Sequence, residues 1–214
     1  MSSTKEQVAT MSTTTPRRVR TRVIVVVALV AAALVAAALY FLRGGEEQAP
    51  YDDARSTGLL TLCGSDGTAV TEGKIGDKPF APVVLGSTAA PAGFDGDGRV
   101  AVLYAHQPRA GVDAAEFSGQ QLIAPTSYAD PGAPAAALTA RSTTLAAFVA
   151  AFPATDDGYV QLRLVLSSPE GGALTDHYDT ADLRVDGDSW HLVRGGHASC
   201  AGAADAVLTG TTTP

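Results

Sequence analysis

The residues of this 214-residue chain best suited to metal chemistry are its four histidines and the aspartates near them. The histidines are His106, His177, His191 and His197. His177 and His191 lie on neighbouring predicted strands, with Asp176, Asp179 and Asp182 nearby, and imidazole and carboxylate groups bind metal ions. No two histidines have the His-x-His or His-x-x-x-His spacing that aligns two ligands on one face. We therefore interpret all four as surface histidines and predict no metal site.

Two aspartate-rich segments resemble parts of a calcium site. Residues 95–98 read Asp-Gly-Asp-Gly, as at the start of a calcium loop, which needs a third oxygen ligand two residues later and a glutamate further on. Arg99 stands where that third ligand should be, and residues 186–188 lack the remaining ligands in the same way. Both segments are predicted to be turns.

No catalytic motif is present in the chain. It contains no Gly-x-Ser-x-Gly elbow and no glycine-rich phosphate loop ending in Lys-Ser/Thr. A carboxylate pair for glycoside cleavage depends on a separation in space that the sequence does not encode. We therefore expect a protein that is not an enzyme and that has no cofactor.

An uncharged apolar run over 23–42, bounded by Arg22 and Arg43, is long enough for one membrane span. As a helix it would be about 30 Å long, the thickness of the hydrocarbon core. Residues 1–22 contain five Lys/Arg and one acidic residue. Because Lys/Arg mark the cytoplasmic side, the N-terminus is predicted inside and the rest outside, with the span contacting membrane lipid. Cleavage of the run as a signal peptide remains an alternative.

The rest of the chain is strongly acidic. Residues 44–214 contain nine Lys/Arg and 21 Asp/Glu, a net charge of −12 that the whole-chain value of −7 conceals. Such a charge repels phosphate backbones, so we predict no nucleic-acid binding.

The two cysteines, Cys63 and Cys200, both fall in the predicted external part. Disulfides persist in oxidising compartments, and neither a Cys-x-x-Cys pair nor zinc-site spacing is present. We predict a Cys63–Cys200 disulfide, which would contribute at most about 5 kcal/mol through chain entropy. A catalytic or metal-binding thiol is the alternative.

The external part has the pattern of a β-rich domain. Strands are predicted at 59–63, 82–87, 99–105, 120–124, 160–167, 174–178, 181–185 and 190–192, with a hairpin turn over 186–189. Apolar residues spaced i, i+3, i+4 and i+7 predict a short helix over 143–152 that packs on a sheet. Trp190 is predicted to lie in the core.

These elements favour a mainly β fold, an immunoglobulin-like β-sandwich with one short helix. The alternative is an α+β fold, a curved antiparallel sheet with the helix packed on it. The predicted organisation is a disordered basic cytoplasmic tail (1–22), a transmembrane helix (23–42), a linker (43–57), an extracytoplasmic β-rich domain (58–207) and a loose tail (208–214).

Three segments resemble a known group of proteins. Gly58–Gly64, Leu103–Arg109 and Val160–Arg163 are similar to uncharacterised single-pass membrane-anchored proteins of high-GC Gram-positive bacteria. That group has no assigned activity, so the resemblance implies an extracytoplasmic domain and no functional residue.

The function expected from this organisation is that of a non-catalytic cell-envelope protein. Its external domain would bind a partner protein or a wall component. An accessory subunit of a secretion or conjugation machine, with the same tail, span and external domain, is one alternative. An extracytoplasmic hydrolase is another.

Overall fold

The structure, a computed structural model, describes residues 49–208. The predicted tail 1–22, the predicted span 23–42 and residues 209–214 lie outside this range. Among the residues it describes, no helix has the length and apolar character needed to cross a membrane.

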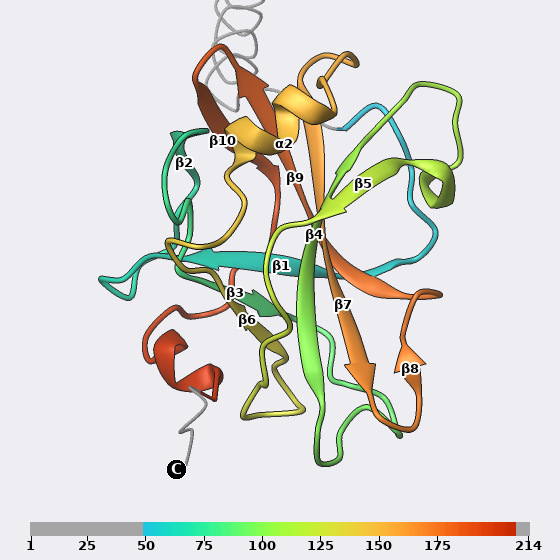
Figure 1. The fold of residues 1–214 in the computed structure, drawn as a ribbon, viewed down its shortest axis with the longest axis vertical. Coiled ribbons are helices and arrows are strands. Elements are labelled where there is room, and N and C mark those ends of the chain that lie inside the picture. Colours follow the sequence, from blue (N-terminus) through green and yellow to red (C-terminus); the bar gives the residue numbers. More distant parts are fainter. Residues whose placement is uncertain (1–48, 209–214) are drawn as a thin grey trace, which may run out of the picture. The chain divides into compact units, whose positions relative to one another are not determined.

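Residues 49–208 form a mainly β domain, as predicted (Figure 1). The strands are β1 (Ser56–Cys63), β2 (Glu72–Lys74), β3 (Val83–Gly86), β4 (Val100–Gln107), β5 (Ser118–Gln121), β6 (Ala135–Ala137), β7 (Tyr159–Ser168), β8 (Gly172–Ala173), β9 (Tyr178–Asp186) and β10 (Ser189–Arg194). The helices are α2 (Leu145–Ala151) and the 3₁₀ turns η1 (Ala114–Glu116) and η2 (Ala203–Ala206).

The strands form one mixed sheet in the order β5-β4-β7-β9-β1-β3-β6. β10 pairs with β9 and β2, and β8 pairs with β7. All pairings are antiparallel except that of β1 with β9, which is parallel. The strands therefore do not form the two separate sheets of the predicted immunoglobulin-like sandwich. The parallel pair of β1 and β9 also differs from the alternative prediction, a curved antiparallel sheet.

Strand β1 joins the two parts of this sheet. Its first half pairs with β9, and its second half, Leu60–Cys63, pairs with β3. Figure 1 shows β1 crossing the direction of the long strands β4 and β7. The chain passes from one part of the sheet to the other within a single strand, which is a known way of making a sheet corner.

The predicted helix is confirmed, with shorter bounds. The Thr144 side chain caps α2 by accepting a hydrogen bond from the Ala147 N–H at 3.0 Å. Leu145 and Phe148 are fully buried in the core. The apolar stripe thus docks a helix that is too short to be stable alone.

The core also contains the predicted buried tryptophan and the predicted disulfide. Trp190 is 1% exposed and packs edge-on against Phe80, with ring centroids 5.9 Å apart. Cys63 and Cys200 form a disulfide, with Cα atoms 5.4 Å apart. Both sulfurs are buried, so the bond ties the end of β1 to the segment after β10.

Most predicted strands are present with shifted ends, and the hairpin between β9 and β10 is confirmed. Three strands were not predicted: β2, the two-residue β8 and the all-alanine β6. The strand expected at 174–178 is absent, because pairing stops after β8 and resumes only at Tyr178.

Candidate functional site

One face of the sheet carries polar side chains in two rows across β4, β7 and β9. His106, Gln161 and Asp182 are aligned in one row. Tyr104, Arg163 and Thr180 form the next. Because side chains alternate along a strand, Leu162 and Leu164 face the apolar core on the opposite side. Gln161 and Arg163 on this polar face are buried, so other parts of the chain cover it.

Arg163 is the centre of the covered face, and its side chain is 5% exposed. Its Nε donates to Gln161 Oε1 at 2.6 Å and its Nη2 to the Ala114 carbonyl at 2.7 Å. The guanidinium also lies 4.8 Å from the centroid of the Tyr178 ring. Burial lowers the pKa of Arg163, and Tyr178 and Asp53 oppose that shift.

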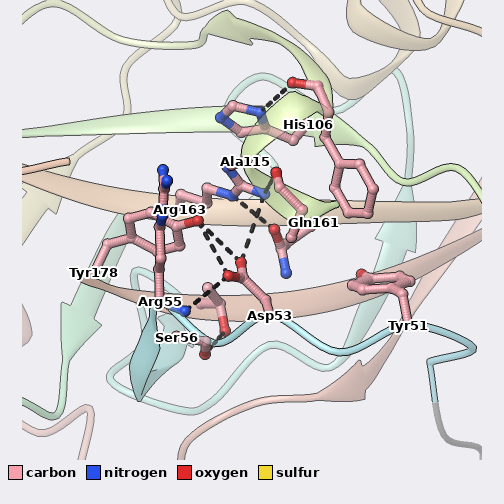
Figure 2. Close-up of polar contacts among 12 residues, drawn as sticks. Tyr51, Asp53, Arg55, Ser56, His106, Ala115, Gln161, Arg163 and Tyr178 are labelled. Atoms are coloured by element: carbon pink, nitrogen blue, oxygen red, sulfur yellow. Dashed lines mark hydrogen bonds and ion pairs between the residues drawn. The ribbon is translucent and has the colours of Figure 1, made fainter. Parts of the chain in front are cut away.

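The counter-ion of Arg163 comes from the segment before β1. A carboxylate oxygen of Asp53 lies 3.5 Å from Arg163 Nη2, and the Asp53 side chain is only 1% exposed. The Tyr178 hydroxyl donates to the same carboxylate at 3.0 Å, and so does the Arg55 N–H, at 3.0 Å. Figure 2 shows these groups converging on Asp53. Burial raises the pKa of Tyr178 to about 12, so it remains a donor.

A second set of contacts fixes the same segment further along β9. The Tyr51 hydroxyl donates to Asp182 at 2.5 Å, and Asp182 also pairs with Arg194 at 2.5 Å. The Tyr51 ring meets the Phe117 and Tyr159 rings edge-on, at 5.3 and 6.3 Å. We call residues 49–55 the strap. The sequence assigned them to a linker, whereas they pack across the sheet.

The loop carrying η1 covers the rest of this face. His106 lies half-buried beneath it, with Nδ1 3.1 Å from the Phe117 carbonyl oxygen. Burial, together with the nearby Arg163, lowers the pKa of His106 from 6.5 to about 4. His106 is therefore neutral near pH 7, and it is not the surface histidine that was predicted.

The chemistry of this covered cluster is structural. It has a cation, carboxylates, phenols and a neutral imidazole, but the strap and the η1 loop lie over them, and the side chains of Arg163 and Asp53 are almost fully buried. An ion pair held this way stabilises the docked strap and offers no group to a substrate. Sequence reasoning missed it because Gln161 and Arg163 alternate with leucines, as residues on a solvated face do.

The histidines and aspartates proposed as metal ligands do not come together. His177 pairs with the exposed Asp176 at 2.9 Å. Asp179 and Asp182 are on opposite faces of the sheet, since they are three positions apart along β9 and side chains alternate between faces. Across residues 49–208, no group of three His, Cys, Asp or Glu side chains has the arrangement of a metal site.

The two aspartate-rich segments are turns, as predicted. Arg99 closes the first by donating from Nη1 to the carbonyls of Asp95 and Gly96, at 3.2 and 3.1 Å. The second is the tip of the β9–β10 hairpin, where Gly187 has a φ of 58°. Glycine adopts this left-handed conformation without strain.

Two hollows are open at the surface of the described domain. A groove of about 560 Å³ runs along β2 and β10, and its lining includes Glu72, Asp77 and Asp186. A smaller pocket lies where β7, β9 and the segment after β3 meet, and its lining includes three leucines, two prolines and one carboxylate, Asp179. Both hollows are open to a partner, whereas Arg163 and Asp53 are buried.

Comparison with known protein families, with curated proteins and with solved structures finds no match to this chain.

Proposed function

We propose that this protein is a non-catalytic, membrane-anchored component of the cell envelope whose external domain binds a partner protein or wall component. The observation that carries the proposal is the covered cluster. The titratable side chains around Arg163 and Asp53 are buried and hold the strap, so these groups are not presented to a substrate.

The groove along β2 and β10 supports a binding role. Its lining carries three carboxylates and one lysine, Lys74, so it favours a cationic or hydroxyl-rich surface. The hydroxyl of Ser189 donates to Asp188 at 3.1 Å and accepts from Lys74 at 3.1 Å. The Ser189 hydroxyl is therefore bound to two exposed charged side chains. An activated serine nucleophile instead donates to a general base that a third group orients.

The proposed location rests on the apolar run 23–42, on the basic residues before it and on the disulfide. A buried Cys63–Cys200 bond is typical of a domain that folds in an oxidising compartment. We infer one membrane span with the N-terminus inside and residues 49–208 outside.

The experiment is site-specific photocrosslinking of the full chain in its native membrane. A crosslinking residue at Glu72 in the groove is compared with one at the exposed Ala150 of α2, a matched surface control. We expect a saturable adduct from position 72 that is absent from position 150 and is lost when Asp77 and Asp186 are changed to asparagine. Equal labelling from both positions, or none from position 72, would contradict groove binding. Protease treatment of spheroplasts tests the orientation, since an external domain is digested without lysis.

A further inference from the structure

Strand β5 is the last strand at one edge of the sheet, next to β4 (Figure 1). The two strands are antiparallel, and the Leu122 N–H, just beyond β5, donates to the Leu103 carbonyl at 2.9 Å. Because every second residue of an antiparallel strand directs its backbone groups to the same neighbour, Gln120 also faces β4. The N–H and C=O groups of Gly119 and Gln121 therefore point away from the sheet.

These outward groups have no partner in the described domain. Gly119 and Gln121 are exposed, and no hydrogen bond from another segment reaches their backbone groups among residues 49–208. A further strand adds to such an edge because its backbone supplies the missing donors and acceptors. β5 also has none of the usual protections of an edge, since it contains no lysine, no proline and no bulge.

The other outer strands of the described domain are capped, covered or very short. At the opposite edge, the Lys74 N–H of β2 donates to the Asp77 carboxylate at 3.0 Å, and the Asp77 N–H donates to the Lys74 carbonyl at 3.2 Å. On β6, Ala135 is fully buried and the Ala137 N–H donates to the Thr126 hydroxyl at 3.4 Å. Strand β8 has only two residues. The open backbone is thus particular to β5.

The open edge is uncharged, although it belongs to an acidic domain. Residues 117–129 contain no Asp, Glu, Lys, Arg or His, whereas residues 44–214 carry a net charge of −12. Two copies of so acidic a chain repel each other, and the repulsion is smallest where each presents an uncharged edge. A basic partner, which the net charge attracts, finds no carboxylate on β5. The charge pattern therefore favours a second copy of the same strand.

We propose that β5 pairs antiparallel with the β5 of a second copy of this chain, about a two-fold axis at Gln120. In this register Gly119 of one copy lies opposite Gln121 of the other, so the outward N–H and C=O groups of both residues are paired. A register centred on Gly119 or on Gln121 would instead need residue 117 or 123, which lie outside the strand.

The dimer leaves the proposed binding groove open on both copies. The groove lies along β2 and β10, and β9, β7 and β4 separate these strands from β5. One dimer would therefore present two grooves, which strengthens binding to a partner that has repeated sites. The geometry of the pairing does not depend on the proposed function.

The interface is small, so the membrane matters for its strength. Specific complexes in solution bury roughly 1,200–2,000 Å², which is more than a pair of four-residue strands supplies. We expect the isolated domain to dimerise weakly and the full chain to dimerise where two copies share a membrane, because confinement raises their effective concentration. In this respect the proposal rests on the proposed membrane location.

The test is disulfide crosslinking of the full chain in its native membrane, with two epitope tags to identify dimers. The two native cysteines are bonded to each other, so an introduced cysteine is the only free thiol. Across the axis, the Cα atoms of the two Gln120 residues would be about 4.5 Å apart, within the range for a disulfide. Those of the two Gln121 residues would be about 9 Å apart, which is too far.

We expect a doubly tagged dimer from Gln120→Cys and its loss in Gln121→Cys, although position 121 is the more exposed. Adding Gln121→Pro to Gln120→Cys should abolish the dimer, because proline removes an outward N–H without breaking a bond to β4. An unchanged urea midpoint shows that the proline variant folds. The comparison of positions 120 and 121 decides the proposal even if that variant does not fold.

Three results would overturn the proposal. Equal crosslinking from positions 120 and 121 indicates random collision, and the absence of a dimer from Gln120→Cys shows that the edge does not pair with itself. An adduct of Gln120→Cys with another protein assigns the edge to a partner's strand instead. The crosslink at position 72 and the protease test of orientation are measured separately, so failure of the dimer is distinguishable from failure of the proposed function.

Discussion

The ion pair beneath the strap makes a quantitative prediction for Asp53→Asn. The substitution keeps the size of the side chain and one acceptor oxygen, at the place of Oδ1, which lies 3.0 Å from the Arg55 nitrogen and 3.3 Å from the Tyr178 hydroxyl. It leaves Arg163 buried without a counter-ion. Breaking a buried pair from one side typically costs ~3–5 kcal/mol. Arg163 keeps its hydrogen bonds to Gln161 and Ala114, and the pair distance of 3.5 Å is long for a direct hydrogen bond. We therefore expect a loss of about 2–3 kcal/mol in the free energy of unfolding.

The assay is urea unfolding followed by the fluorescence of Trp190, which is the only tryptophan and lies in the core. With a slope of about 2 kcal/mol/M, the expected loss lowers the midpoint by about 1 M. Asp52→Asn is the matched control, because Asp52 is exposed and should change stability by less than about 0.5 kcal/mol.

A double-mutant cycle with Arg163→Met isolates the pair. A coupling of about 1 kcal/mol or more between Asp53 and Arg163 is expected for residues in direct contact. If Asp53→Asn shifts the midpoint no more than Asp52→Asn does, or if the coupling is near zero, the strap is not held by this ion pair.

Three further predictions concern the same framework. Replacing Cys63 and Cys200 by alanine should lower the free energy of unfolding by ~2–5 kcal/mol in urea titrations, and an unchanged midpoint would contradict the stabilising role of the bond. Because the fold lowers the pKa of His106 to about 4, its neutral form stabilises the protein above pH 6.5, and this stability is lost as the pH falls toward 4. Between pH 7.5 and 5 the wild type should lose about 2 kcal/mol more than His106→Gln, whereas parallel pH profiles would refute the shift. Gly58→Ala should destabilise by about 1–3 kcal/mol, because its Cβ would meet the Asp179 carboxylate; thermal melting within 1 °C of the wild type would contradict this close packing.

The helix and the central strand could be predicted because their residues follow a regular spacing of apolar side chains. The stripe from Leu145 to Phe152 identified the helix, and the alternation over 160–167 identified the central strand. Strand β6 has no such signal, because Ala135–Ala137 combines low β propensity with no alternation. Strand β6 is defined by its antiparallel pairing with β3, a contact that the local sequence does not indicate.

The parts that were missed depend on contacts between distant segments. Gln161 and Arg163 have the pattern of a solvent-facing row, and nothing near them in sequence shows that residues 49–55 lie over that row. The composition of the strap, with one proline, two alanines and two aspartates, is also that of a linker. The mixed topology was missed for the same reason, since the parallel pairing of β1 with β9 leaves no local trace.

The pairing of β1 also sets the order in which the domain can be completed during synthesis. Ser56 on β1 and Thr180 on β9 share a hydrogen bond although they are 124 residues apart, and the disulfide joins residues separated by 137. Strand β1 can therefore pair with β3 soon after both are synthesised. Its pairing with β9 must wait until nearly the whole chain has been made. Until then a strand that is buried in the finished domain is open to other chains, which makes the domain slow to close and prone to aggregate before it is complete.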